Sequence, residues 1–172
     1  MNTVHTLQEY VVALRDAGIL TGCTVPEALL GRGVECLTYD TRTLRENALF
    51  ICKGAHFKEE YLRDALSHGA FAYVAEQQHD VDAPCILVSD IRYSLVVLGQ
   101  LFYDHVTDKL TSIGITGTKG KSTTAYYVRY ILNDWLRAQD RNECAILSSI
   151  DNYDGKVSEE SHITTPEVLE LY

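Results

Sequence analysis

The sequence has no apolar run long enough to cross a membrane and no excess of basic charge. Every apolar stretch falls short of the roughly 18 residues of a transmembrane helix, and the N-terminal MNTVHTLQEYVV is polar where a signal peptide would be apolar. The net charge of -9 argues against nucleic acid and anionic lipid, which bind basic surfaces. We therefore expect a soluble, cytoplasmic protein with no nucleic-acid partner and no membrane insertion.

The cysteine patterns of zinc sites and disulfide frameworks are also missing. Five cysteines are spread over 172 residues without a C-x-x-C pair or the cysteine and histidine spacing of a zinc site. An odd number of widely spaced cysteines is typical of buried thiols in a reducing compartment. What the chain does have is 46% hydrophobic residues, enough to pack one domain and part of a second.

Apolar periodicity predicts an α/β layer structure in the first hundred residues. A helix is expected from Thr6 to Ala17, ending before Gly18, a residue favoured at helix C-termini. Further strands are predicted over 36–39, 48–52, 71–75 and 85–88, and further helices over 59–68 and 91–103. This order is typical of an α/β domain, which we place at residues 1–106 because the polar stretch 104–109 follows it.

A strand, loop and helix are predicted next, as the opening βαβ unit of a parallel sheet. The strand is expected over 110–116, the loop over 117–120, the helix over 121–136, and the next strand over 144–147. A turn is expected at 152–155, and Pro166 is expected to begin another helix. We assign residues 107–172 to this second, incomplete domain.

The loop of this unit, GITGTKGKST at 114–123, has the composition of a phosphate site. Its three glycines allow close approach of backbone N–H groups to an anion at a helix N-terminus. Lys121 would reach the β and γ phosphates of a nucleotide and act in catalysis, and the Ser122 hydroxyl would ligate Mg²⁺. The general P-loop pattern has Gly where this chain has Ile115, so the match is a variant, and a glycine-rich turn without a ligand is the alternative.

This loop closely resembles the ATP-binding loop of the Mur ligases, cytoplasmic enzymes that add amino acids to the UDP-N-acetylmuramic acid precursor of peptidoglycan. Upstream, TYDTRTLRENALFICKG at 38–54 is similar to the N-terminal signature of that family, and HGAFAYVAE resembles its continuation. Downstream, ITTPE at 163–167 is similar to a segment of the members that add the third residue, the MurE type. The resemblance implies an N-terminal α/β UDP-binding domain followed by the start of a parallel-sheet ATPase domain.

Site residues follow from the resemblance by position. The implied ATP-binding residues are Gly117, Thr118, Lys119, Gly120, Lys121, Ser122 and Thr123. Those implied to hold the UDP end of the substrate are Tyr39, Thr41, Ala55, His56 and Phe57, and those implied to contact its muramyl-peptide are Thr164 and Thr165. Thr41, Lys119 and Ile163 stand where the family usually has Ser, Asn and Asn.

The implied reaction uses ATP and Mg²⁺ to join an amino acid to UDP-N-acetylmuramoyl-L-alanyl-D-glutamate through an acyl-phosphate. The resemblance implies that the chain is the N-terminal portion of such a ligase, inactive alone, and that the amino acid binds in a C-terminal domain outside this sequence. Two other interpretations stay open: a stand-alone P-loop or kinase-like protein, and a non-catalytic UDP-sugar-binding module. Asp40 and Arg42 are equally open to a purely structural role, as a pair that stabilises a turn.

Overall fold

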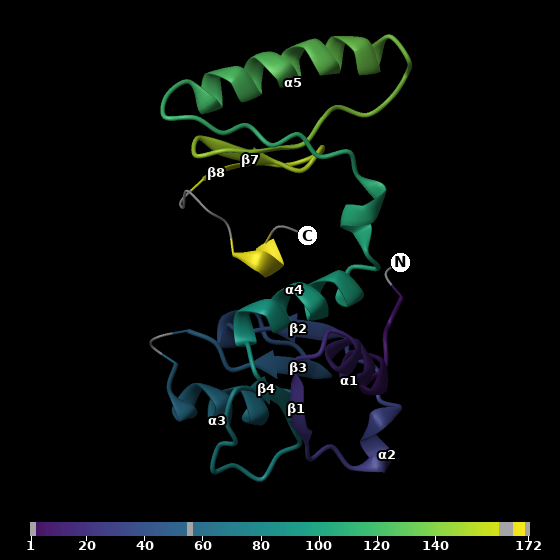
Figure 1. Ribbon diagram of the computed structural model, residues 1–172, viewed down its shortest axis with the longest axis vertical. Coiled ribbons are helices and arrows are strands. Elements are labelled where there is room, and N and C mark those ends of the chain that lie inside the picture. The colour runs from purple at the N-terminus through teal and green to yellow at the C-terminus, as the bar shows by residue number, and fades with distance from the viewer. Residues whose placement is uncertain (1–2, 55–56, 162–166, 171–172) are drawn as a thin grey trace. The chain divides into compact units, whose positions relative to one another are not determined.

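The structure is a computed structural model that describes residues 3–54, 57–161 and 167–170. The chain divides into two compact units (Figure 1). The first comprises Met1–Leu110 and Val168–Tyr172, and the second comprises Thr111–Glu167. Within the described residues, no helix combines the length and the apolar character that crossing a bilayer requires.

A five-stranded sheet forms the centre of the first unit. Its order is β1-β5-β4-β3-β2, and β2 to β5 run parallel while β1 pairs antiparallel with β5 at one edge. The strands are β1 (Leu20–Cys23), β2 (Cys36–Thr38), β3 (Ala48–Ile51), β4 (Ala70–Ala75) and β5 (Cys85–Val88). The central strands are almost continuously apolar because helices cover the sheet on both faces.

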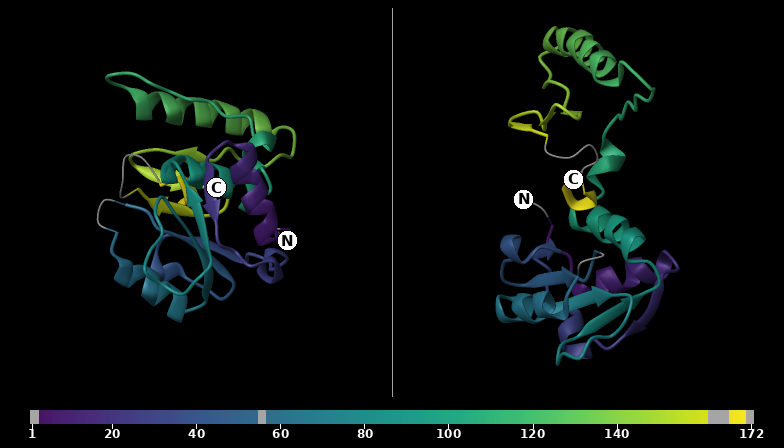
Figure 2. Two further views of the ribbon diagram at one scale, coloured as in Figure 1. Left: turned by 60° about the horizontal axis from the view of Figure 1, so that its bottom comes forward. Right: turned by 90° about the vertical axis from the view of Figure 1, so that its left-hand side faces the viewer.

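Helices lie on the two faces of this sheet and form an α/β/α sandwich (Figures 1 and 2). The helices are α1 (Leu7–Asp16), α2 (Glu27–Leu30), α3 (Glu59–Ser67) and α4 (Ile91–Phe102). One core cluster joins α1 and α4 to side chains such as Leu49 and Val74, and a second joins α3 to the opposite face through Phe50 and Tyr73. Successive side chains along each strand point to opposite faces of the sheet, so they pack alternately against α1 and α4 or against α3.

The predicted helix α1 has a defined start and end. Thr6 and Glu9 form a capping box at its N-terminus, which was not predicted, with the Thr6 N–H donating to Glu9 Oε2 at 2.7 Å. Gly18 ends the helix with a φ of 72°, which the absence of a Cβ permits. The predicted strands and helices of this unit are all confirmed, with bounds that differ by at most one residue at either end. The edge strand β1 and the single-turn α2 were not predicted.

The second unit contains α5 (Lys121–Arg137) and a three-stranded antiparallel sheet of order β6-β7-β8. Its strands are β6 (Ile146–Leu147), β7 (Asp151–Tyr153) and β8 (Ser158–Glu160). The turn predicted at 152–155 is found two residues later, at 154–157 between β7 and β8, where the Asp154 carboxylate accepts N–H bonds from Lys156 and Val157, both at 2.7 Å. The 3₁₀ turn Val106–Lys109, which precedes the loop, belongs to the first unit.

The predicted strand over 110–116 is wrong, and the parallel crossover is not formed. Residues 111–116 belong to no strand, and β6 pairs with β7 in an antiparallel arrangement. The physical reason is that a β-strand is stabilised by hydrogen bonds to a neighbouring strand. Because β6 takes β7 as its partner, the apolar segment that precedes the loop has no strand to pair with in the described part of the chain. Ile113 accordingly stays 59% exposed.

The predicted helix start at Pro166 lies outside the described residues. The 3₁₀ turn Val168–Glu170 follows, and its Val168 and Leu169 pack against the core cluster that contains α1 and α4. The described part of this segment therefore belongs to the first unit.

Candidate functional site

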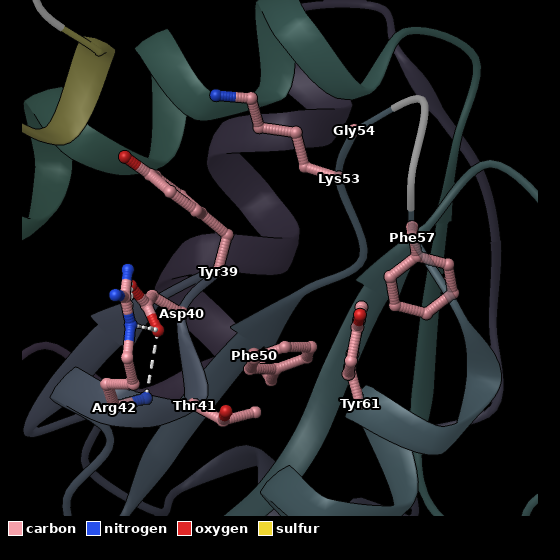
Figure 3. A pocket seen from close by; sticks show the side chains of 9 residues that line it. All are labelled: Tyr39, Asp40, Thr41, Arg42, Phe50, Lys53, Gly54, Phe57 and Tyr61. Carbon is pink, nitrogen blue, oxygen red and sulfur yellow. Dashed lines mark hydrogen bonds and ion pairs between the residues drawn. The ribbon is translucent and has the colours of Figure 1, made fainter.

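A pocket of about 460 Å³ opens at the carboxyl ends of β2 and β3 in the first unit. Loops at this edge of a parallel sheet commonly carry the ligand-binding residues of α/β proteins. The lining residues are Tyr39, Asp40, Thr41, Arg42, Phe50, Lys53, Gly54, Phe57 and Tyr61. Three of the residues implied to hold the UDP end, Tyr39, Thr41 and Phe57, thus lie in one cavity (Figure 3).

The turn after β2 is held by two threonine hydroxyls. The buried Thr38 side chain accepts a hydrogen bond from the Asp40 N–H at 3.0 Å, and its Oγ1 lies 2.7 Å from Thr43 Oγ1. Thr43 Oγ1 also donates to the Asp40 carbonyl oxygen at 3.1 Å. These bonds close the 3₁₀ turn Thr41–Thr43 at both ends, and so fix the backbone that presents Tyr39 and Thr41 to the pocket.

Opposite charges line the same side of the pocket. The Arg42 guanidinium donates to both carboxylate oxygens of Asp40, at 2.5 to 3.0 Å, which confirms the turn-stabilising pair (Figure 3). Hydrogen bonding from Arg42 holds the pKa of Asp40 below its usual range. The Lys53 ammonium lies 4.4 Å from the centroid of the Tyr39 ring. The lining therefore carries two cations and one carboxylate, a balance that suits an anionic ligand.

Aromatic side chains form the other side of the pocket. Phe57 and Tyr61 lie next to each other, and Phe50 lies between them and the Asp40–Arg42 pair in the view of Figure 3. Phe50 is 1% exposed and belongs to the core, whereas Tyr61 is 45% exposed. Flat apolar rings facing a few charged groups match a ligand that has both a planar ring and an anionic part.

Four of the substrate residues implied by the resemblance lie outside the described residues: Ala55, His56, Thr164 and Thr165. The structure adds Asp40, Arg42, Lys53 and Tyr61 to the lining. Lys53 and Tyr61 were missed by sequence reasoning, although the position of Lys53 directly after a buried parallel strand was a usable signal.

The phosphate loop of the second unit begins α5. Gly120 is the N-cap residue with a φ of 76°, and no side chain caps the helix there. The first-turn N–H groups of a helix have no intrahelical partner, so an uncapped N-terminus offers donors and a partial positive charge to an anion. The exposed Lys121 ammonium donates to the Gly117 carbonyl oxygen at 2.8 Å, which brings the cation inside the loop. The implied ATP-binding residues Gly117 to Thr123 are therefore contiguous around one helix N-terminus.

The Ser122 hydroxyl lies beside another hydroxyl. Its Oγ is 3.5 Å from Ser149 Oγ. In the described ranges, no group of three or more His, Cys, Asp or Glu side chains could hold a metal ion. Mg²⁺ usually keeps several waters and binds through substrate phosphates with few protein ligands. These residues thus fit a magnesium ion that is bound together with a nucleotide.

The tyrosines of α5 have different surroundings. Tyr126 donates a very short hydrogen bond to Asp151, and this bond is the main cause that raises the pKa of Tyr126. Tyr127 and Tyr130 are each 68% exposed, and together with Tyr126 and Thr123 they line a second pocket. Tyr126 therefore packs through its hydroxyl against Ser148 and against Asp151, the first residue of β7.

Sequence comparisons relate the chain to curated ligases. It is 42% identical over 151 residues to the UDP-N-acetylmuramoyl-L-alanyl-D-glutamate–L-lysine ligase of Enterococcus faecalis, covering 87% of this chain and 29% of that one. The ligase of the same name from Streptococcus thermophilus is 42% identical over 137 residues, covering 79% of this chain and 27% of that one. The chain thus spans less than a third of the length of these relatives. No protein-family model matches.

Solved structures show the same fold. A UDP-N-acetylmuramoyl-L-alanyl-D-glutamate–2,6-diaminopimelate ligase aligns with a TM-score of 0.62 and 18% identity, covering 98% of this chain and 32% of that one. A UDP-N-acetylmuramoylalanyl-D-glutamyl-2,6-diaminopimelate–D-alanyl-D-alanyl ligase from Acinetobacter baumannii aligns with a TM-score of 0.53 and 20% identity, covering 80% of this chain and 29% of that one. The mixed α/β architecture with a parallel-sheet core is therefore shared with these ligases.

Proposed function

We infer that this chain is the N-terminal portion of a Mur ligase, the family to which its curated relatives and structural neighbours belong. The observation that carries this inference is the 42% identity that extends over 87% of the chain. The aligned region extends far beyond the phosphate loop. A lone loop would not distinguish a ligase from other nucleotide-binding proteins.

The proposed reaction joins an amino acid to UDP-N-acetylmuramoyl-L-alanyl-D-glutamate with consumption of ATP in the cytoplasm. A carboxylate is a poor electrophile, so the γ-phosphoryl group of ATP is first transferred to the glutamyl carboxylate, which gives an acyl-phosphate and ADP. The amine of the amino acid then attacks the acyl carbon, and phosphate leaves as the amide bond forms. Positioning and charge neutralisation supply most of the rate enhancement in such phosphoryl transfers.

The two units take different parts in this proposal. The pocket of the first unit, in the domain proposed at 1–106, binds the UDP end of the substrate through Tyr39, Thr41 and Phe57. Residues 107–172 begin the ATP-binding domain. Lys121, which already lies within the loop through its bond to the Gly117 carbonyl, turns to the β and γ phosphates when ATP binds. The ammonium then offsets the negative charge of the transferred group.

The remaining site residues have secondary roles in the proposal. Ser122 would supply one oxygen ligand to Mg²⁺, and the metal would offset the negative charge of the nucleotide phosphates. Thr164 and Thr165, together with Ala55 and His56, are proposed to contact the substrate by their position in the sequence. The amino acid is proposed to bind in a C-terminal domain, as implied by the family resemblance.

Two separate calorimetric titrations of the chain test this assignment against its alternatives. We expect UDP-N-acetylmuramoyl-L-alanyl-D-glutamate to bind to the first unit, and ATP with Mg²⁺ to bind weakly to the second. Tight ATP binding without binding of the UDP-substrate would favour a stand-alone P-loop protein. Binding of the UDP-substrate that Thr41→Val and Tyr39→Ala leave unchanged would show that the pocket is not its site.

A further inference from the structure

His79 lies in the loop that follows β4, next along the sheet from the two loops that line the pocket of the first unit. Its side chain is 10% exposed, whereas the side chain of His68 is 68% exposed. None of the family motifs described above includes His79. A nearly buried histidine in a loop at the ligand-binding edge of the sheet requires a physical explanation.

The surroundings of His79 fix its position from several directions. The backbone N–H of His79 donates to the Tyr73 hydroxyl at 3.2 Å, and the ring Nδ1 lies 3.8 Å from Glu59 Oε2. Arg63 donates to Glu59 Oε1 and to the Asp80 carbonyl oxygen, both at 2.6 Å, and so ties the loop to α3. The loop is thereby held against a helix and a central strand, which makes His79 a fixed support.

The His79 ring in turn contacts a residue of the pocket. Its centroid lies 5.1 Å from that of Phe57, with an angle of 51° between the planes, and 6.0 Å from that of Tyr73 on β4. These separations fall within the range of favourable aromatic pairs. The Phe57 N–H donates to the Gly54 carbonyl oxygen at 3.0 Å, which places its backbone but leaves the ring free to rotate about its side-chain bonds. The contact with His79 restricts that rotation.

We propose that His79 is a positioning residue that holds the Phe57 ring in its binding orientation in the pocket, and that it acts through its ring rather than through its charge. The proposal rests on the proposed function, because it takes the UDP-substrate as the ligand of this pocket. An orientation that is already fixed before binding spares the ligand the entropic cost of ordering the side chain.

The test uses the 172-residue chain with His79→Ala, His79→Phe and, as a matched control, His68→Ala, which removes an exposed histidine outside the pocket. Calorimetry measures the Kd of UDP-N-acetylmuramoyl-L-alanyl-D-glutamate. We expect His79→Ala to raise Kd about three- to tenfold, the equivalent of one aromatic pair. His79→Phe and His68→Ala should leave Kd within about twofold, a change too small to represent a lost ring contact.

A second measurement does not depend on ligand binding. The chain has four phenylalanines, so selective labelling resolves the Phe57 ring by NMR. In the ligand-free chain, His79→Ala should increase the motion of this ring, and His79→Phe should restore its order. If His79→Ala unfolds the chain, His79→Leu replaces it, because leucine fills the space without an aromatic ring.

The outcomes separate the two proposals. Absence of UDP-substrate binding by the unsubstituted chain would contradict the proposed function, and Phe57 ring motion would still decide the role of His79. An unchanged Phe57 ring in His79→Ala or His79→Leu would overturn the inference. Equal loss of affinity in His79→Ala and His79→Phe would also overturn it, since the imidazole itself would then be required.

Discussion

Thr38→Val removes one hydroxyl at the base of the turn that presents Tyr39 and Thr41 to the pocket, and it keeps the size and branching of the side chain. The lost oxygen accepts the Asp40 N–H at 3.0 Å and lies 2.7 Å from Thr43 Oγ1. An N–H group or hydroxyl that loses its partner in a buried site costs about 1–3 kcal/mol. Thr38 is 6% exposed, so we expect a loss of about 2 kcal/mol in the free energy of unfolding of the first unit.

Urea unfolding measures this loss separately for the two units. The only tryptophan of the chain is Trp135 in α5, so tryptophan fluorescence follows the second unit, while far-UV circular dichroism follows both. The expected change is a lower midpoint at an unaltered slope for the first unit. The fluorescence transition should not move.

Thr24→Val is the matched control for ligand binding. Thr24 Oγ1 accepts the Cys85 N–H at 2.9 Å, and Thr24 does not line the pocket. Loss of the Thr24 hydroxyl should lower the free energy of unfolding of the first unit without changing the Kd of UDP-N-acetylmuramoyl-L-alanyl-D-glutamate. Thr38→Val, in contrast, should raise that Kd several-fold. The reasoning fails if Thr38→Val leaves both stability and Kd unchanged, or if the two variants weaken binding equally.

Three further predictions concern other residues. Burial lowers the pKa of His5, but its hydrogen bonds to two carboxylates outweigh burial and raise the pKa above 6.5. The contribution of His5 to stability is therefore complete at lower pH and is lost as pH rises through the raised pKa. His5→Gln should make the free energy of unfolding depend less on pH across this range, as measured by urea unfolding at several pH values. Gly120→Ala should destabilise α5 by about 1 kcal/mol in Trp135 fluorescence melts, because a φ of 76° is strained for alanine although the added Cβ contacts nothing within 4 Å. Lys121→Met should weaken ATP binding about tenfold or more in calorimetry, as expected for loss of a charged hydrogen bond, while binding of the UDP-substrate stays unchanged.

The first unit was predictable from sequence because its signals are local and agree with each other. The apolar runs that form β3 and β4 are bounded by turn residues, and α1 has both a capping residue and a terminal glycine. The edge strand β1, with the sequence LTGC, was missed since its four residues alternate between half-buried and exposed and include a glycine that weakens strand propensity.

The second unit shows the limit of pattern reasoning. Residues 110–116 have the composition of a buried strand, yet strand formation depends on a partner that is not encoded in the segment itself. The candidate site shows the same limit. Tyr39, Thr41 and Phe57 were named from motif positions, but the contact between Phe57 and His79 joins residues 22 positions apart through the packing of two loops. Such contacts follow from the fold and leave no local signal.

Ligation by a chimera tests the central claim most directly. In the chimera, this chain replaces the corresponding N-terminal part of the Enterococcus faecalis lysine ligase, of which it covers 29%. Formation of ADP and of the lysine adduct is measured with UDP-N-acetylmuramoyl-L-alanyl-D-glutamate, ATP and lysine, beside a Lys121→Ala chimera. We predict product from the first chimera, and from the second a loss of product with retained binding of the UDP-substrate. A folded chimera that binds both ligands and forms no product, or equal activity of the two chimeras, would contradict the account.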